Sequence, residues 1–480
     1  MSSAERVERI VGAAEEDGPV LRVIWPVLPA AARYGLAGEI VAAVEPHSEA
    51  DPAALLVTAL AAFGALVGAG PHARADGAEH PARIWPLIVG DTAKSRKGTS
   101  WVNIRRVFDA ADPGFTADRV LAGFGSGEAL VDAVGGDQDR RALVVETEYG
   151  RVLAVCRREG STLATLLRQA WDGGRLQVRS RVATSVADNA HVVVIGHVTR
   201  AELLARMAES DALGGSLNRF VIVAARRSKL LPSGGNLDDS IVADFGRKVA
   251  FVASQVRTVG LVRRTPEAEA LWGGLYAEMA ADDPGGLLGA ATARDSAQML
   301  RLSVAYALID GSKVIRPEHI LAAQGVWDYS RASAAGIFGE RTGDPMSDLI
   351  LDELQRHGSE GLDGTAIRDL LGRHAKRERI ERATDILIER GLATKATKGT
   401  HGRPRTVVQL ATKATKATKV EEQLTTGDDD SASRSLEDEP DESIAAGAYS
   451  DDREGRQFWS TPEADDYLAT FGDEDLGESC

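Results

Sequence analysis

Four short apolar runs constrain the fold of this chain more strongly than any other feature of its sequence. They cover residues 84–90, 142–146, 191–199 and 219–227, and each has the length and composition of a buried strand. Helical patterns lie between them, at residues 125–134, 161–171 and 200–210. Strands that alternate with helices are typical of a largely parallel sheet. The sequence therefore predicts an α/β fold built around these four strands.

The regions on either side of the strands have a different character. Helical patterns cover residues 29–47 and 51–68 before the first strand and residues 264–342 after the last one. Residues 345–410 then predict helices followed by a short strand. A chain of 480 residues is too long for one ordinary core, and its length favours about three domains.

Residues 53–70 carry no charged side chain and raise the question of a membrane span. Seven alanines and three glycines make this stretch only marginally apolar on membrane-insertion scales. Asp51 followed by Pro52 is typical of a helix N-cap and the first helical position. The pattern therefore favours a buried helix over a membrane span.

Composition points to a cytoplasmic protein without a disulfide framework. The first 18 residues are acidic and lack the apolar segment of a signal peptide. Two cysteines cannot form a disulfide scaffold or a thiolate metal site. The net charge of −15 arises in residues 421–480, which hold 20 Asp and Glu against 3 Arg. The rest of the chain is nearly neutral, so its overall acidity does not exclude nucleic-acid binding.

The loop after the first strand is the strongest candidate for a binding site. It reads Gly-Asp-Thr-Ala-Lys-Ser-Arg-Lys-Gly-Thr-Ser from Gly90 to Ser100 and leads into a helix. A phosphate-binding loop needs this context, because backbone N–H groups, a helix N-terminus and a lysine all attract phosphate. The match to GxxxxGK[ST] is imperfect, since Arg96 replaces the second glycine. The alternative is a basic surface loop. The candidate phosphate-binding residues are Gly90, Lys94, Ser95, Lys97, Gly98, Thr99 and Ser100.

Two carboxylates close the second predicted strand. Glu146 ends the apolar run, which is the position that holds Mg²⁺ beside a phosphate loop, and Thr99 would supply a hydroxyl ligand. Glu148 lies two residues further on and is a candidate for orienting the attacking water. The alternative is an ordinary strand with a polar end. Together with the loop, these residues predict a site for ATP and Mg²⁺.

Polar residues at the other two strands extend this prediction. His197 ends the third run together with Thr199, and strand carboxyl ends face the ligand crevice in parallel sheets. His197 is therefore a candidate γ-phosphate contact, with a structural histidine as the alternative. Arg219 lies at the start of the fourth run and is a candidate arginine finger for a neighbouring subunit, with a structural salt bridge as the alternative.

A basic segment near the C-terminus indicates a second function. Residues 365–420 hold 14 Lys and Arg against 5 Asp and Glu. Two predicted helices followed by a basic hairpin are typical of a winged helix that binds duplex DNA. The candidate DNA contacts are Arg377, Arg379, Arg382, Arg403 and Arg405. The alternative is a winged helix that contacts protein.

Several motifs together resemble a family of mobile-element ATPases, found in plasmids and phages, whose function is largely unknown. They are HSEADP, GDTAKSRKGTS, SGEAL, LVVETEYGRVL, RREGSTLATLLRQAWDGG, IGHVT, LNRF and RLSVAYALIDG. The family is related to RecA-like plasmid replicative helicases, and the resemblance extends over residues 22–410. It implies a RecA-like P-loop core with a mostly parallel sheet. With the patterns above, this gives an N-terminal helical region (1–75), the ATPase core (76–262), a helical extension (263–342) and a winged helix (343–412). The low apolar content of the last residues predicts a disordered acidic tail (413–480).

The resemblance implies that Lys97 binds phosphate, that Thr99 and Glu146 hold Mg²⁺ and that Glu148 positions water. We therefore expect an ATPase of the helicase or loader type that binds DNA, including single strands in its core. We also expect a homo-oligomer that binds no membrane. The rival hypothesis is a non-catalytic winged-helix regulator in which the degenerate P-loop is structural.

Overall fold

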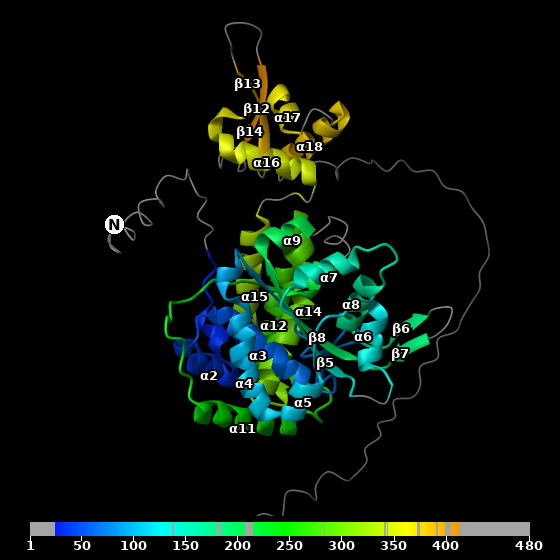
Figure 1. The fold of residues 1–480 in the computed structure, drawn as a ribbon, viewed down its shortest axis with the longest axis vertical. Helices are drawn as coiled ribbons and strands as arrows, with labels where there is room; N and C mark the ends of the chain where they lie inside the picture. The colour runs from blue at the N-terminus through cyan, green and yellow to red at the C-terminus, as the bar shows by residue number, and fades with distance from the viewer. Residues whose placement is uncertain are drawn as a thin grey trace, which may run out of the picture. The chain divides into compact units, whose positions relative to one another are not determined.

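The fold is described from a computed structural model of the 480-residue chain (Figure 1). The structure describes residues 25–411, apart from residues 137–138, 180–183, 207–214, 283, 340–341, 343, 372–374, 390–391 and 399–404. The predicted acidic tail at 413–480 lies outside the described residues, as do residues 1–24 and the candidate DNA contact Arg403.

A five-stranded parallel sheet lies at the centre of the larger hydrophobic core. Its spatial order is β4 (Val120–Leu121), β5 (Arg141–Glu146), β8 (His191–Thr199), β3 (Pro86–Gly90) and β9 (Val221–Ala224). Every neighbouring pair is parallel. The predicted α/β class with a largely parallel sheet is therefore confirmed, and the four predicted strands are β3, β5, β8 and β9. β4 was not predicted, because two residues leave no readable apolar pattern.

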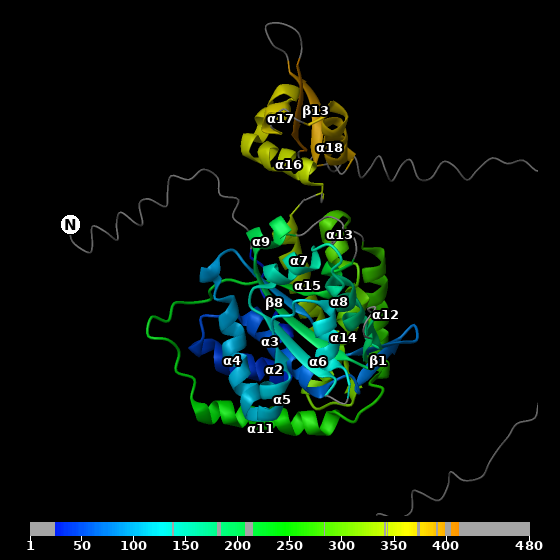
Figure 2. The ribbon, with the colours of Figure 1, turned by 45° about the vertical axis from the view of Figure 1, so that its right-hand side comes forward.

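The chain reverses its direction across the sheet between β3 and β8. The connection from β3 leads to β4 at one edge, whereas the connection from β8 leads to β9 at the other edge. Because crossovers between parallel strands are right-handed, these connections lie on opposite faces. Figures 1 and 2 both draw α4 and α8 on opposite sides of β8. The carboxyl ends of β3 and β8 therefore border a crevice of the kind that binds ligands in open α/β sheets.

Helices surround the sheet and account for most of the described residues up to 338. They are α2 (Gly35–Val44), α3 (Pro52–Val67), α4 (Lys97–Ala111), α5 (Pro113–Asp118), α6 (Gly127–Val134), α7 (Tyr149–Cys156), α8 (Leu163–Asp172), α9 (Arg200–Arg206), α11 (Asp239–Val256), α12 (Pro266–Ala281), α13 (Gly286–Thr292), α14 (Asp295–Ile309) and α15 (Pro317–Phe338). Short 3-10 turns occur at η1 (Ala30–Arg33), η2 (Glu45–His47), η3 (Ala93–Ser95) and η4 (Leu217–Arg219).

One hydrophobic core extends from Ala32 to Phe338 and includes the sheet and helices on both sides of it. It joins side chains from the three segments predicted at 1–75, 76–262 and 263–342. The N-terminal helices and the helical extension therefore share their buried surface with the sheet. The helix α3 lies almost wholly inside this core, since 15 of its residues from Ala53 to Val67 are buried.

The predicted start of α3 is confirmed in detail. The Asp51 carboxylate accepts a hydrogen bond from the Ala53 N–H at 3.0 Å, and Pro52 is the first helical residue. Among the helices of the described chain, none combines the length and apolarity that a membrane crossing requires. The uncharged stretch therefore forms a helix of the protein core.

Small two-stranded sheets decorate the larger core. β1 (His72–Ala75) and β2 (Ala78–Pro81) form one antiparallel hairpin, and β6 (Leu176–Arg179) and β7 (Thr184–Ala187) form another. β10 (Arg263–Arg264) pairs with β11 (Val314–Ile315). None of these strands was predicted, because each is short and partly exposed.

A second hydrophobic core is formed by residues between Met346 and Leu410. Its helices are α16 (Pro345–His357), α17 (Gly364–Leu370) and α18 (Arg377–Glu389), with a 3-10 turn at η5 (Gly358–Glu360). Its antiparallel sheet has the order β12 (Leu362–Asp363), β14 (Arg405–Leu410) and β13 (Ala393–Lys398). Residues 393–398, which repeat the tripeptide Ala-Thr-Lys, thus form a strand. Their composition does not indicate a strand, and it is the pairing with β14 that stabilises it.

Candidate functional site

A cavity of about 770 Å³ lies at the carboxyl ends of β3, β5 and β8. This is the point where the chain reverses its direction across the sheet, and the volume is in the range of small-molecule sites. The cavity is lined by Arg96, Lys97, Gly98, Thr99, Trp101, Val102, Thr147, Glu148, His197, Val198, Thr199 and Glu202. The structure therefore brings together predicted residues from three separate strands.

The loop between β3 and α4 is folded tightly against the end of β3. Thr92 and Ser95 exchange side-chain and backbone hydrogen bonds in a capping box around η3. A Cβ atom at Gly90 would lie only 2.6 Å from the Cβ atom of Ser95, so only glycine fits there. Gly90 and Ser95 therefore shape the loop without lining the cavity, and Lys94 is exposed outside it.

Arg96 is the residue at which the loop turns into α4. Its backbone is left-handed, with φ 57° and ψ 28°, a conformation that costs most residues other than glycine about 1 kcal/mol or more. Its Nε atom lies 2.7 Å from Oε2 of Glu49. Glu49 in turn accepts the Leu231 N–H at 2.9 Å. The arginine that replaces the motif's second glycine is thus held by an acidic partner at the rim of the cavity.

Lys97 is the first residue of α4 and faces the cavity. Its Nζ donates a hydrogen bond to the Thr92 carbonyl at 3.1 Å, across the loop. Partial burial lowers the pKa of Lys97, and Glu202 and Asp91 oppose this shift. Gly98 and Thr99 follow in the first turn, where the helix dipole favours an anion.

Ser100 does not belong to the cavity. It is fully buried, and its hydroxyl donates to the Lys97 carbonyl at 2.7 Å. Asn103, one turn further on, donates to the Thr99 carbonyl at 2.9 Å and to the Ser48 hydroxyl at 3.2 Å. These bonds fix the first turn of α4 against the segment before α3.

The two predicted carboxylates have different environments. Glu146 is buried and accepts the Gly123 N–H at 2.6 Å, so its side chain holds the loop after β4. Glu148 is exposed and lines the cavity at the N-terminus of α7. Within the described ranges, no group of three or more His, Cys, Asp and Glu side chains is arranged to hold a metal ion.

His197 lies at the floor of the cavity. It is only 1% exposed, and neither ring nitrogen has a hydrogen-bond partner in the described structure. Burial lowers its pKa to about 4, with a further contribution from Lys97. The ring is therefore neutral at pH 7, and both of its nitrogens are buried without a partner among the described residues. Thr199 lies beside it, and its hydroxyl accepts the Glu202 N–H at 3.2 Å.

Arg219 lies outside the cavity, in a separate cluster. Its guanidinium donates to Asp172 at 2.8 Å, to the Gly215 carbonyl at 2.5 Å and to the Arg168 carbonyl at 3.3 Å. It also faces the Trp171 ring. The structure thus shows the salt bridge that the sequence left as the alternative, and the guanidinium is engaged within its own chain.

The sequence did not point to three of the residues that line the cavity. Glu202 follows β8 in the first turn of α9, and its charge acts on Lys97. Trp101 and Val102 add an apolar wall, and Val102 is 62% exposed, which is unusual for an aliphatic side chain. That exposure was not readable from the sequence, because the helix α4 has ordinary amphipathic spacing.

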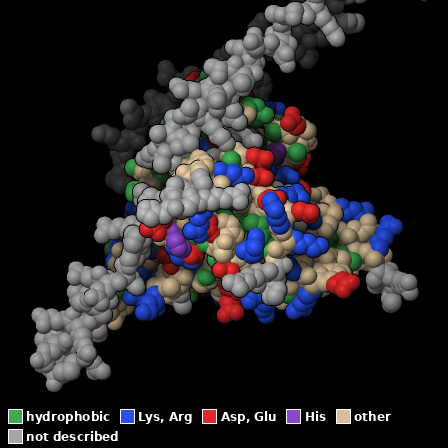
Figure 3. Space-filling view, turned by 90° about the horizontal axis from the view of Figure 1, so that it is seen from above, with side chains coloured by type: hydrophobic (Ala, Val, Ile, Leu, Met, Phe, Trp, Pro, Cys, Tyr) green, Lys and Arg blue, Asp and Glu red, His purple; other side chains and the backbone are tan. Residues whose placement is uncertain are grey.

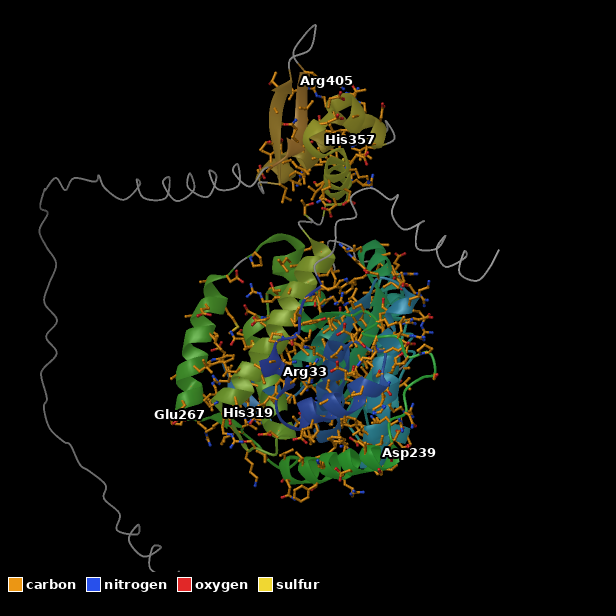
Figure 4. The ribbon with its side chains drawn as sticks, turned by 90° about the vertical axis from the view of Figure 1, so that its left-hand side faces the viewer. Arg33, Asp239, Glu267, His319, His357 and Arg405 are labelled. Atoms are coloured by element: carbon orange, nitrogen blue, oxygen red, sulfur yellow. The ribbon has the colours of Figure 1, made fainter. Side chains whose placement is uncertain are left out.

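The candidate DNA contacts lie on the smaller core. Arg379 and Arg382 on α18 line a cavity of about 480 Å³ together with Lys376, which directly precedes this helix. Arg377 is paired with Glu381 at 2.7 Å, and Arg405 on β14 is paired with the buried Asp363 (Figure 4). On the face drawn in Figure 3, Lys and Arg side chains are interspersed with Asp and Glu.

Comparison with known proteins adds no assignment. Neither the models of known protein families nor the curated proteins contain a match to this chain. The proposed function therefore rests on the residues of the cavity and their chemistry.

Proposed function

We propose that the cavity at the ends of β3, β5 and β8 binds the phosphates of a nucleoside triphosphate, and that the protein is a P-loop ATPase. The observation that carries the proposal is the meeting of Lys97, the N-terminus of α4 and the unpaired ring of His197 in one cavity. Each of these groups is suited to an anion or a polar ligand. The exposed Val102, together with the largely buried Trp101, gives an apolar wall on which a base can pack.

The residues present fit a nucleotide with Mg²⁺, and they suggest a division of roles. Thr99 would hold the ion through its hydroxyl, and Glu146 would hold it indirectly while it anchors Gly123. Mg²⁺, when bound, would neutralise charge that develops on the phosphates. Lys97 would bind and orient the phosphates, and the exposed carboxylate of Glu148 would orient water.

We further propose that the core is RecA-like and that the smaller core is a winged helix that binds DNA. The parallel sheet with its reversal beside the phosphate loop supports the first proposal. Three helices packed on a three-stranded antiparallel sheet, with Arg379 and Arg382 on one helix, support the second. Such a protein would act as an oligomeric helicase or loader of a mobile genetic element.

The rival hypothesis is a non-catalytic winged-helix regulator that binds DNA and in which the degenerate P-loop is structural. The hydrogen bond between Glu146 and the Gly123 N–H favours it, because that carboxylate already has a structural role. A motor would hydrolyse ATP faster in the presence of single-stranded DNA. A regulator would bind duplex DNA with sequence preference and show no such stimulation.

The deciding experiment measures ATP hydrolysis by the full-length protein with and without an oligothymidylate. The variant Lys97→Ala removes the phosphate contact, and Lys94→Ala is the matched control, since it removes an exposed lysine from the same loop outside the cavity. We expect stimulated hydrolysis that Lys97→Ala abolishes and Lys94→Ala retains. Equal rates in both variants would refute the assignment of the site.

A further inference from the structure

A second cavity, of about 580 Å³, lies at the opposite edge of the sheet. It is lined by residues just before the amino ends of β3 and β8 and by the end of α8, including Arg83, Asp172, Gly173, Gly174, Asn189 and Ala190. The nine residues of β8 separate it from the first cavity, which corresponds to roughly 25 Å at the rise of an extended strand. A ligand in one cavity therefore does not reach the other.

Arg83 lines this cavity although it is only 2% exposed. Its Nη1 and Nη2 atoms donate to the carbonyls of Trp171 and Ala190 at 3.0 and 3.2 Å. Its Nε atom has no partner in the described structure. These carbonyl partners are neutral, so they satisfy donors without balancing the charge.

The charge around Arg83 is unbalanced. Arg301 is 1% exposed, lies on the Trp171 ring and donates to the same Trp171 carbonyl at 2.9 Å. Arg219 and Arg294 both reach Asp172, at 2.8 and 3.4 Å. Among the described residues, Arg83 and Arg301 form no ion pair of their own, so Asp172 is the carboxylate nearest to four guanidinium groups. Glu79, the other acidic residue of the cavity wall, pairs with His72 and Arg74. The cluster also caps the C-terminus of α8, but a helix end carries only about half a negative charge.

Buried charge without a counter-charge is costly, and proteins usually balance it with a partner or a ligand. Here the unbalanced charge is positive and borders a cavity. We propose that this cavity binds a phosphate-bearing anion, with the guanidinium group of Arg83 as its main contact. A planar guanidinium with free donors matches the oxygens of phosphate.

Two further features of the cavity support an anion. Gly173 has φ 96°, and a Cβ atom there would lie 2.6 Å from Nη1 of Arg83, so only glycine leaves room for the guanidinium at this wall of the cavity. The neighbouring His80 has its pKa lowered to about 4, by burial first and then by Arg301, Arg83 and Arg294. The positive potential that disfavours a charged histidine also favours an anion in the same region.

The test uses inorganic pyrophosphate and full-length protein carrying Lys97→Ala, so that the first cavity does not contribute. Titration calorimetry should still detect one pyrophosphate site. Arg83→Gln should weaken it about tenfold to a hundredfold, as expected for loss of a hydrogen bond between charged groups. Because Arg83 is buried and its variant can fail to fold, Asn189→Asp is the second variant. It adds a negative charge at the cavity wall, and aspartate tolerates the left-handed backbone there, at φ 54°.

The matched control is Arg175→Gln, which removes an exposed arginine that pairs with Asp188. It should change the affinity by less than about twofold. The proposal is overturned if Lys97→Ala abolishes all pyrophosphate binding, or if Asn189→Asp binds as tightly as its parent. These readings need no ATP turnover, so they are independent of the proposed ATPase. Displacement of pyrophosphate by oligothymidylate would assign the site to a nucleic-acid backbone, and its retention would assign the site to a free phosphate ligand.

Discussion

Arg96 and Glu49 form an ion pair of 2.7 Å at the rim of the cavity between the ends of β3, β5 and β8. The Leu231 N–H, together with Arg227 and Arg96, holds the pKa of Glu49 below its usual range. Glu49 is the acidic partner of Arg96 in this pair. It neutralises Arg96, which would otherwise add positive charge beside Lys97.

The first prediction follows from this pair. Glu49→Gln should raise the affinity for ATP by about two- to fivefold, because it releases Arg96 and removes a negative charge beside the phosphates. Glu45→Gln is the control, since Glu45 pairs with Arg33 and Lys229 and does not line the cavity. Fluorescence titration with a nucleotide analogue measures the change. A lower affinity in Glu49→Gln would mean that the pair organises the loop for binding.

Glu146→Gln should separate binding from turnover. The amide oxygen of glutamine can still accept the Gly123 N–H, which Glu146 now accepts at 2.6 Å, so the loop after β4 keeps its position. The loss of charge should lower the hydrolysis rate at least tenfold, while ATP affinity changes by less than about threefold. Steady-state kinetics and equilibrium binding on the same preparation give both numbers. If ATP affinity falls as far as in Lys97→Ala, the carboxylate has no role in holding the metal.

The buried histidine predicts a dependence of stability on pH. The pKa of His197 is about 4 in the folded protein, against 6.5 as its ordinary value. Between these two pH values the unfolded chain therefore binds more protons than the folded protein does. The stability that the neutral ring contributes is present above about pH 6.5 and is lost as the pH falls toward 4. The loss attributable to His197 is up to about 3 kcal/mol.

Urea unfolding of the wild type and of His197→Gln at pH 7.5 and pH 5 checks this prediction. His80 and His191 also have lowered pKa values and destabilise both proteins on acidification. The difference between the two proteins isolates the contribution of His197. An equal pH dependence in the two proteins would contradict it.

Arg219 should be a stabilising residue without a direct role in hydrolysis. Arg219→Met removes the donors to Asp172, Gly215 and Arg168, and should reduce the free energy of unfolding by about 1–3 kcal/mol. The hydrolysis rate per folded molecule should stay within about threefold of wild type. A loss of activity of a hundredfold or more with unchanged stability would instead support an arginine finger.

The DNA prediction concerns the smaller core and the acidic tail. Lys376, Arg379 and Arg382 share one cavity wall, and about four phosphate contacts there would give a log–log salt slope near −4 for duplex binding. Deletion of residues 344–480 should remove most of this affinity, because it removes these basic side chains. The truncated protein should still fold, because the larger core ends at Phe338 and keeps its own hydrophobic contacts.

Deletion of residues 421–480 alone should tighten DNA binding, most clearly at low salt, because it removes 20 acidic residues that compete with DNA for the basic segment. Titration of labelled duplex at several salt concentrations compares the two truncations with the full chain. If the protein without residues 344–480 binds as well as the full chain, the DNA contacts lie in the larger core.

Much of the candidate site was readable from local sequence. The apolar runs ending in Gly90, Glu146 and Thr199 became the three strands whose ends border the cavity. The loop between the first run and its helix placed Lys97 and Thr99 there, because strand–loop–helix order is encoded within a few residues. Lys94, Ser95 and Ser100 were grouped with them by proximity in sequence, although their side chains point to solvent or pack beneath the loop.

What the sequence determined alone is therefore the local pattern: which residues form strands, that Asp51 and Pro52 begin α3, and that a basic loop precedes α4. The tertiary structure decided the spatial order of the strands, the pairing of Arg96 with Glu49, and the cluster in which Arg83 and Arg301 meet at Trp171. These relations join residues tens to hundreds of positions apart. Helix caps and apolar periodicity depend on neighbours along the chain, whereas ion pairs and buried charge depend on which surfaces the whole fold brings together.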